Sequence, residues 1–414
     1  MTHPGDTATL DAIRIVAALL AAAALIALVT RRLRLPYAVA LVVLGLVAGA
    51  VLPEGALRVT PELVLLVLLP GLVFEAALRL EVEQLRRTFG WLVLLAAPGV
   101  LVSAVVVAVI LQLATGLRFE LGMVVGAMVA ATDPVAVLAT FRDLRVPRRL
   151  ATLVEGESLF NDATALVLFA ATIGVITEGA TVGETAIDLL EALVGSIGIG
   201  LAAGWLASRL IALVEDHPIE LTISIAAAYG TYLLADGLGQ SGIIATVAAG
   251  IVIGSHGRSV GLSPRALESL DVVWELIAFL LTAFAFLLVG LAISVGELVS
   301  AAPSILWGLI AIVVGRACVV YGLLGGAARL LESARPGGSG EGGSEVPLAW
   351  LHVLFWAGLR GAVAVAMALS LPEDFPERAL LQQITFGIVL FTLVVQGTTA
   401  SVVVTRAGAV EERP

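Results

Sequence analysis

Long apolar runs, separated by short polar segments, cover most of the chain. A helix needs about 20 apolar residues to cross the hydrocarbon core of a bilayer. Thirteen runs fit this role: roughly 10–30, 36–52, 61–79, 91–115, 120–141, 152–177, 187–214, 219–236, 241–255, 270–293, 303–331, 348–371 and 380–405. Because the polar segments between them are short, the pattern predicts an all-α polytopic membrane protein with a single membrane domain over residues 1–406.

Composition supports this prediction. Hydrophobic residues make up 59% of the 414 residues and charged residues 14%, against about 45–50% and about 25% in soluble domains. These values exclude a soluble multi-domain enzyme, and the net charge of −10 excludes a nucleic-acid binder with a basic face. Cys318 is the only cysteine, which excludes an intramolecular disulfide and a cysteine-cluster metal site. We expect no cleavable signal peptide, because arginines follow the first run at once.

The placement of arginine predicts the orientation, since all 23 basic residues are arginine. Segments after odd-numbered runs, together with the C-terminal tail, carry 17 arginines, whereas segments after even-numbered runs carry 3. Loops rich in positive charge stay on the cytoplasmic side of a membrane. We therefore expect a cell-membrane protein, in the inner or plasma membrane, with its N-terminus outside and its C-terminus in the cytoplasm.

The thirteen spans divide into two sets of six around a linker span at 187–214. A first repeat over about 10–177 and a second over about 219–405 would have opposite orientations, as do the inverted repeats of secondary transporters. Helix breakers with a charge recur at equivalent places, at Ala131–Pro134 in span 5 and Gly358–Gly361 in span 12. We expect both of these helices to be discontinuous.

Two segments lie outside the spans. Residues 333–346 are rich in Gly and Ser and predict a flexible cytoplasmic loop. A phosphate-binding loop is the alternative, but no strand precedes the segment and no Gly-Lys-Ser/Thr follows it. Residues 407–414 predict a short cytoplasmic tail.

Span 6 carries the strongest candidate site. Helical spacing places four of its polar residues on one broad face: Glu157, Ser158, Asn161 and Asp162. Ionisable groups inside a bilayer are unfavourable unless they serve a function, and Na⁺ prefers carboxylate, hydroxyl and carbonyl oxygens. Asp162 and Ser158 are therefore candidate cation ligands, with a polar patch between helices as the alternative.

The break in span 5 adds to this site. Pro134 disfavours helix at Asp133 and frees carbonyl groups near Thr132, which can coordinate a cation. Asp133 also fits the N-cap of a helix that starts at Pro134. We expect Thr132 to be the ligand and Asp133 to neutralise the N-terminus of a half-helix.

The other charged residues within the spans suggest supporting roles. Arg360 lies between two glycines and favours neutralisation of a broken helix end over contact with substrate. Arg316 lies near the middle of span 11 and needs an anion, for which Glu157 is the candidate. Glu75 is either part of an acidic funnel that gathers cations or a carboxylate that reaches the cytoplasmic interface, while Glu275 favours interfacial anchoring. No metal-ligand cluster, dinucleotide loop or Ser-His-Asp order stands out, so we expect neither an enzyme nor a cofactor.

Three motifs, in this order, resemble the monovalent cation:proton antiporter 1 family, the NhaP-type sodium/proton antiporters related to the animal sodium/proton exchangers. They are ATDPVAV at 131–137, ESLFNDA at 157–163 and GLRGAVAVAMAL at 358–369. The resemblance implies thirteen spans, inverted six-helix repeats and a homodimer. It implies that Asp162 binds either the proton or the cation, that Ser158 and the Thr132 region complete the cation shell, and that Glu75 joins directly or through water.

The resemblance also implies which residues support the site. Asn161 would tie span 6 to the unwound stretch of span 5. Glu157 and Arg316 would form the central ion pair of the family, and Asp133 and Arg360 would balance the crossing half-helices.

The mechanism that these residues suggest is competition for one carboxylate. A proton or a Na⁺ (or Li⁺) ion would each neutralise Asp162, and Asn161 cannot titrate, so exchange of one H⁺ for one Na⁺ is expected to be electroneutral. Spans 5, 6, 12 and 13 would move as a bundle against a dimerising scaffold.

Three alternatives stay open: a K⁺/H⁺ antiporter of the same fold, a sodium-coupled transporter of an organic anion or other organic solute, and a membrane scaffold or sensor. The chain departs from the family at Thr282, where members often carry Asn; we expect the difference to alter packing rather than transport. No long cytoplasmic domain follows Arg406, so regulation through such a tail is not expected.

Overall fold

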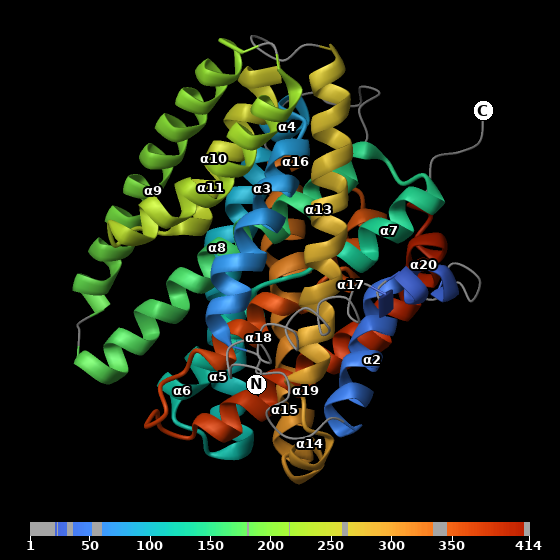
Figure 1. The fold of residues 1–414 in the computed structure, drawn as a ribbon. Helices are drawn as coiled ribbons and strands as arrows, with labels where there is room; N and C mark the ends of the chain where they lie inside the picture. The colour runs from blue at the N-terminus through green and yellow to red at the C-terminus, as the bar shows by residue number, and fades with distance from the viewer. Residues whose placement is uncertain are drawn as a thin grey trace, which may run out of the picture.

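The computed structural model describes residues 21–22, 24–30, 36–51, 60–179, 182–214, 216–258, 264–333 and 346–409, and the regular structure in these ranges is helical (Figure 1). The predictions for most of span 1, for most of the 333–346 loop and for the tail beyond residue 409 lie outside the described residues.

The first half of the described chain is helical at residues 21–22 and 24–30, and eight labelled α-helices follow. They are α2 (Tyr37–Val51), α3 (Leu69–Arg79), α4 (Val82–Leu94), α5 (Val100–Thr115), α6 (Phe119–Ala130), α7 (Val135–Leu144), α8 (Arg148–Glu178) and α9 (Val182–Ile211). Short π-helical segments precede α3 (η1, Leu63–Leu68) and join α4 to α5 (η2, Leu95–Gly99). Glycines with positive φ end α5 at Gly116 and α8 at Gly179, where other residues would be strained.

The second half follows the same pattern. Its α-helices are α10 (His217–Gly237), α11 (Gly242–Val252), α13 (Pro264–Leu291), α14 (Val295–Ser300), α15 (Ala302–Ala317), α16 (Gly325–Ser333), α17 (Leu348–Trp356), α18 (Ala362–Leu369), α19 (Arg378–Phe391) and α20 (Gly397–Arg406). Three π-helical segments continue or join them: η3 (Ile253–Gly257), η4 (Cys318–Leu324) and η5 (Thr392–Gln396).

Seven helices within the described residues are long and apolar enough to cross a membrane: Val82–Thr115, Arg148–Thr177, Leu190–Ile211, His217–Gly237, Ser269–Leu291, Ala302–Leu331 and Arg378–Arg406. The predicted total of thirteen spans and their repeat pairing stay predictions. The helix over the fourth apolar run begins at Val82, earlier than the predicted 91. Its polar first turns are stabilised by an i,i+4 ion pair between Glu83 and Arg87. The short helix α14 was not expected from the apolar pattern.

Small residues let neighbouring helices approach closely. A Cβ atom at Gly290 of α13 would overlap the backbone of α2 at Val42, and one at Gly126 of α6 would overlap α5 at Ala104. In a bilayer the hydrophobic effect contributes little to helix association, because the lipid tails are as apolar as the side chains. Close van der Waals packing of this kind stabilises the contact between helices instead. Figure 1 shows α9 along one side of the helix bundle and α2 and α20 at the opposite side.

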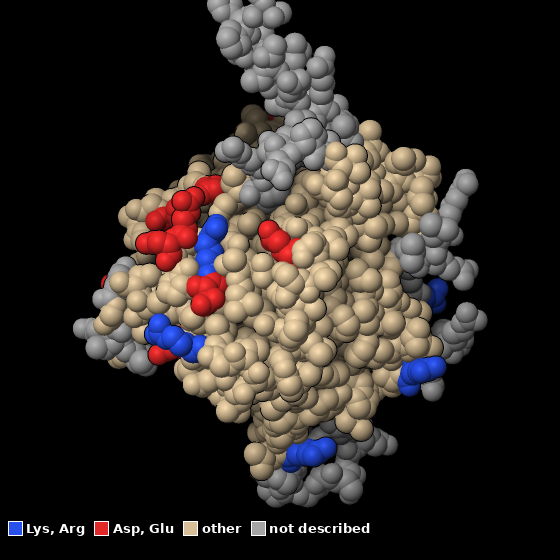
Figure 2. Space-filling model, turned by 90° about the horizontal axis from the view of Figure 1, so that it is seen from below, with Lys and Arg blue, Asp and Glu red and all other residues tan. Residues whose placement is uncertain are grey.

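The exposed surface also fits a bilayer. Large apolar side chains such as Leu113, Leu190 and Leu233 are exposed along the helices. At the end of the molecule that is lowest in Figure 1, charged side chains gather on parts of the face and leave the rest uncharged (Figure 2). The long apolar helices and this apolar surface are typical of an integral membrane protein.

Two helices are interrupted, at the positions that the sequence predicts. The backbone leaves the helix between α6 and α7 at 131–134, and between α17 and α18 at 357–361. The two breaks meet, because the N–H of Asp133 donates a hydrogen bond of 2.8 Å to the carbonyl of Leu359. This crossing places four half-helix ends in the core of the protein.

Candidate functional site

Arg360 holds the carbonyl end of one half-helix. Its Nη1 donates hydrogen bonds to the carbonyl oxygens of Ala130 (3.1 Å) and Ala131 (3.2 Å), where α6 ends. These carbonyls have no partners within their own helix, and a positive charge there offsets the negative end of the helix dipole. The Arg360 side chain is buried, so water screens its charge little and its interaction with these carbonyls is strong.

Asp133 serves the opposite ends of the half-helices. Its Oδ1 accepts a hydrogen bond of 3.1 Å from the N–H of Val135, the first residue of α7. A Cβ atom at Gly361 would collide with the Asp133 carboxylate, so that position needs a glycine. The carboxylate therefore lies against the N-termini of both α7 and α18, where a negative charge is favourable.

The polar face of α8 divides between two environments. Ser158 and Asp162 line a cavity of about 330 Å³, while Glu157 and Asn161 turn toward Arg316 and Arg360. The sequence placed the α8 polar residues on one broad face. In the structure Ser158 bonds to the break after α6, while Glu157 pairs with the Arg316 side chain from α15, and this separates the two pairs. The two pairs can therefore perform different tasks, one at the cavity and one behind it.

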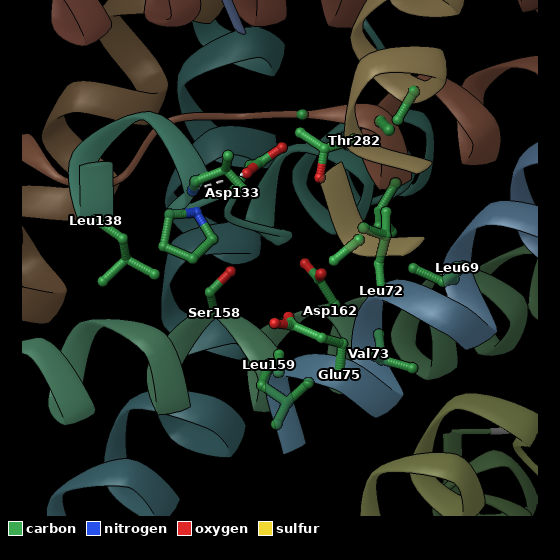
Figure 3. A pocket seen from close by; sticks show the side chains of 18 of the residues that line it. Leu69, Leu72, Val73, Glu75, Asp133, Leu138, Ser158, Leu159, Asp162 and Thr282 are labelled. Carbon is green, nitrogen blue, oxygen red and sulfur yellow. Dashed lines mark hydrogen bonds between the residues drawn. The ribbon is translucent and has the colours of Figure 1, made fainter. Parts of the chain in front are cut away.

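Oxygen atoms converge on the cavity. The Ser158 hydroxyl donates a hydrogen bond to the carbonyl of Thr132 in the break, and Asp162 lies one turn beyond Ser158 on the same face of α8. The Oδ1 atom of Asp162 is buried and has no hydrogen-bond partner among the described residues. Figure 3 shows the Asp162 and Glu75 carboxylates pointing into the same space, with Ser158 and Thr282 around it. Carboxylate, hydroxyl and carbonyl oxygens form the ligand set that a hard monovalent cation requires.

Behind the cavity, Glu157 and Arg316 form a buried bidentate ion pair. Nη1 of Arg316 donates to Oε1 of Glu157, and Nη2 donates to Oε2 at 2.9 Å. The guanidinium also donates to the carbonyl of Leu354 in α17, from Nη2 at 2.6 Å and Nε at 3.2 Å. The pair that the sequence suggested thus links α8, α15 and α17, and it leaves Asp162 as the carboxylate without a basic partner on its Oδ1.

Asn161 differs from its implied role. The resemblance implied a tie between Asn161 and the unwound stretch of span 5, but the direct hydrogen bond to that stretch comes from Ser158. The Nδ2 atom of Asn161 instead donates to Oε1 of Glu157 at 3.4 Å. Asn161 faces the ion pair because it lies four residues beyond Glu157, on the same side of the helix, and one residue before Asp162, about 100° away from the cavity side.

Glu75 and Glu275 both line the cavity, and Arg79 lies between them. The Trp274 side chain next to Glu275 is fully buried and donates to Ser224 Oγ at 3.0 Å. Trp274 is therefore a packing residue. Glu275 lines the cavity, and interfacial anchoring by its carboxylate stays a prediction.

Three residues line the cavity without having been predicted to do so from the sequence. Thr282 is one of them, and the expectation that it alters packing rather than transport stays a prediction. Glu155 lies seven residues before Asp162, a spacing that places both on one helix face and could have revealed it. Arg79 carried no such signal, because its role depends on the contact between α3 and α13. Within the described ranges, no three His, Cys, Asp or Glu side chains gather as a resident metal site.

The chain matches the family model described as sodium/hydrogen exchanger, transmembrane, over residues 16–406. It is 37% identical over 384 residues to the Na⁺/H⁺ antiporter ApNhaP of Aphanothece halophytica, covering 92% of this chain and 71% of that protein. It is 32% identical over 406 residues to the Na⁺/H⁺ antiporter NhaH of Halobacillus dabanensis, covering 95% and 97% of the two chains.

The fold is also similar to a solved structure. The sodium proton antiporter MjNhaP1 of Methanocaldococcus jannaschii at pH 8 superposes with a TM-score of 0.78 and 20% identity, covering 95% of this chain and 98% of that one. Because the two sequences are only 20% identical, this similarity is evidence for the fold alone.

Proposed function

The chain belongs to the sodium/hydrogen exchanger family, and from that premise we propose that it is an antiporter that exchanges Na⁺ (or Li⁺) for H⁺ across the membrane. The observation that carries this proposal is the Asp162 carboxylate, which enters the cavity with a buried oxygen that no described residue binds. Such a carboxylate is neutralised by whichever small cation reaches it, a proton or a metal ion.

The neighbouring oxygens would hold the metal ion as substrate. Asp162 supplies the charge, Ser158 the hydroxyl, and Thr132 a carbonyl freed by the helix break. Glu75 lines the same cavity and adds a second carboxylate, directly or through water. The Ser158 hydroxyl donates to Thr132 in the structure, and it would turn its lone pairs to the ion when the ion binds.

The remaining polar groups would keep this site in place. Asp133 and Arg360 neutralise the half-helix ends at the crossing. The Glu157–Arg316 pair with Asn161 fixes α8 against α15 and α17. Each of these groups makes at least one hydrogen bond within the protein, whereas Oδ1 of Asp162 makes none to a described residue, so we assign the exchange of charge to Asp162.

Transport would follow from which forms of Asp162 can move. The protonated and the cation-loaded carboxylate are neutral, whereas the empty carboxylate carries a charge that is unfavourable away from water. Helices α6–α8 and α17–α20 would move against a scaffold formed by the other helices, in a homodimer of inverted repeats with the N-terminus outside. One exchanging carboxylate gives one H⁺ for one Na⁺.

Competition at one carboxylate predicts how pH affects transport. Lowering the pH raises the fraction of protonated Asp162, so the apparent KM for Na⁺ should rise, approaching about tenfold per pH unit once the proton form dominates. Maximal velocity at saturating Na⁺ should change much less, because Na⁺ displaces the proton. Initial rates in vesicles at several pH values measure both quantities; a KM that does not change with pH would contradict a shared site.

Electroneutral exchange predicts insensitivity to membrane potential. Since one positive charge crosses in each direction, the initial rate should be the same at zero potential and at an imposed potential of either sign. Vesicles clamped with K⁺ and valinomycin measure this. A rate that changes with potential would contradict one-for-one exchange while leaving antiport intact.

A further inference from the structure

One guanidinium stands among the carboxylates of the cavity. Within the described residues that line it, five are acidic and one is basic: Glu75, Asp133, Glu155, Asp162 and Glu275, with Arg79. Arg79 lies in the last turn of α3, one turn beyond Glu75, and its Nε is 2.5 Å from Oε1 of that carboxylate. Its Nη2 is 3.6 Å from Oε2 of Glu275 on α13. Arg79 thus bridges two helices and two carboxylates.

The two carboxylates occupy different positions in the cavity. The Glu75 side chain is 16% exposed and the Glu275 side chain is 64% exposed. Glu75 points into the space that Asp162 enters (Figure 3). Glu275 is therefore the outer partner and Glu75 the inner partner. The Trp274 ring packs on Phe74 with ring centroids 4.7 Å apart, which holds α13 and α3 in this register.

The contacts of Arg79 are close but poorly aligned. Its Nε and Nη2 are shielded from solvent, yet neither makes a hydrogen bond of good geometry to a described residue. Arg316, by contrast, is fixed by a bidentate pair and a backbone carbonyl. Ion pairs that lack aligned hydrogen bonds are weaker than bidentate ones, so the Arg79 guanidinium is the one of the two that can change partners.

We propose that Arg79 is a tethered counter-cation that competes with the transported cation for Glu75 and moves toward Glu275 when that cation enters. The inference rests on the proposed function, because it requires a metal ion at the cavity. Arg79 neutralises Glu75 when the cavity holds no cation, and it gives that charge up on loading. It therefore sets the apparent affinity for the cation without being a ligand or a proton carrier.

The test compares apparent KM for Na⁺ in vesicles. Arg79→Gln removes the competitor and should lower KM by about fivefold, the change expected when a partly exposed ion pair is lost. Arg79→Lys keeps the charge and should stay near the wild-type KM. Glu275→Gln removes the outer partner, leaves Arg79 on Glu75, and should raise KM. Arg87→Gln removes the same charge from the exposed Glu83 pair on α4 and should leave KM unchanged.

The double variant Arg79→Gln/Glu275→Gln shows whether Glu275 affects KM by binding Arg79 or only through its own negative charge. If Glu275 acts through Arg79, Glu275→Gln should have no effect on KM in the Arg79→Gln background, whereas independent charges would give additive changes. An Arg79→Gln KM that is unchanged or raised, or additive changes in the double variant, would overturn the inference. Absence of any Na⁺-dependent proton movement by the wild-type protein would instead overturn the proposed function.

Discussion

Replacing Asp162 by Asn should reduce Na⁺-driven proton movement to the level of protein-free vesicles. Asparagine keeps the shape and the polar contacts of the side chain but can neither take up a proton nor neutralise a cation at neutral pH. Because Asp162 lies in the interior of helix α8 and asparagine has nearly the same size, the variant should still fold and insert. The measurement is the change in internal pH after Na⁺ addition to vesicles with matched amounts of protein.

A matched control removes the same charge elsewhere. Asp374 is exposed in the segment between α18 and α19 and does not line the cavity. Asp374→Asn should therefore exchange at the wild-type rate. Full exchange by the Asp162→Asn variant would remove Asp162 from the mechanism and would favour a transporter with another coupling site.

The second large effect concerns the buried Glu157–Arg316 pair. Removing one partner leaves an uncompensated charge in the core, which destabilises proteins by about 3–5 kcal/mol. Glu157→Leu and Arg316→Met should each lower the midpoint of thermal unfolding strongly. The double variant should recover much of the loss, because no lone charge remains. Thermal unfolding in detergent, followed by the amount of monodisperse protein, measures the effect.

The pair should also affect transport through the crossing. A Cβ atom at Gly358 would lie 2.9 Å from Nε of Arg316, so the guanidinium packs directly on the break in span 12. The double variant is therefore expected to fold but to exchange slowly. Equal stability of the single variants and the wild type would contradict a role for the pair in holding α8, α15 and α17 together.

The sequence pattern predicts much of the site because the governing physics is local. Pro134 and the glycines at 358 and 361 interrupt helices wherever they stand, and i,i+4 spacing places Ser158 and Asp162 on one face. The polar ends of helices are harder to predict. Helix α4 begins at Val82 because Leu85 and Thr88 continue its buried face beyond the apolar run, at helical spacing from Trp91 and Leu92.

Contacts between distant helices could not be predicted in the same way. The separation of Asn161 from the cavity depends on the Arg316 side chain, which reaches from α15 to Glu157, and the place of Arg79 depends on the approach of α3 to α13. Thr282 is a neutral residue in an apolar helix, with nothing in its neighbours to mark it as a cavity residue. Tertiary packing decides all three.

The charges at the cavity also bear on the organic-anion alternative. Its acidic lining residues outnumber its single described arginine, and that arginine contacts Glu75 and Glu275. An organic anion would meet repulsion from these carboxylates and find no cationic partner that lacks an acidic neighbour. The lining favours a small cation as substrate.

The most direct test of the central claim uses purified protein in vesicles that enclose a fluorescent pH indicator, with a pH gradient imposed across the membrane. Na⁺, Li⁺ or K⁺ is then added outside. We predict that Na⁺, and with it Li⁺, drives proton movement that saturates with ion concentration and that K⁺ does not. Proton movement driven by K⁺ alone would identify a K⁺/H⁺ antiporter, and no proton movement with any of the three ions would contradict cation/proton exchange.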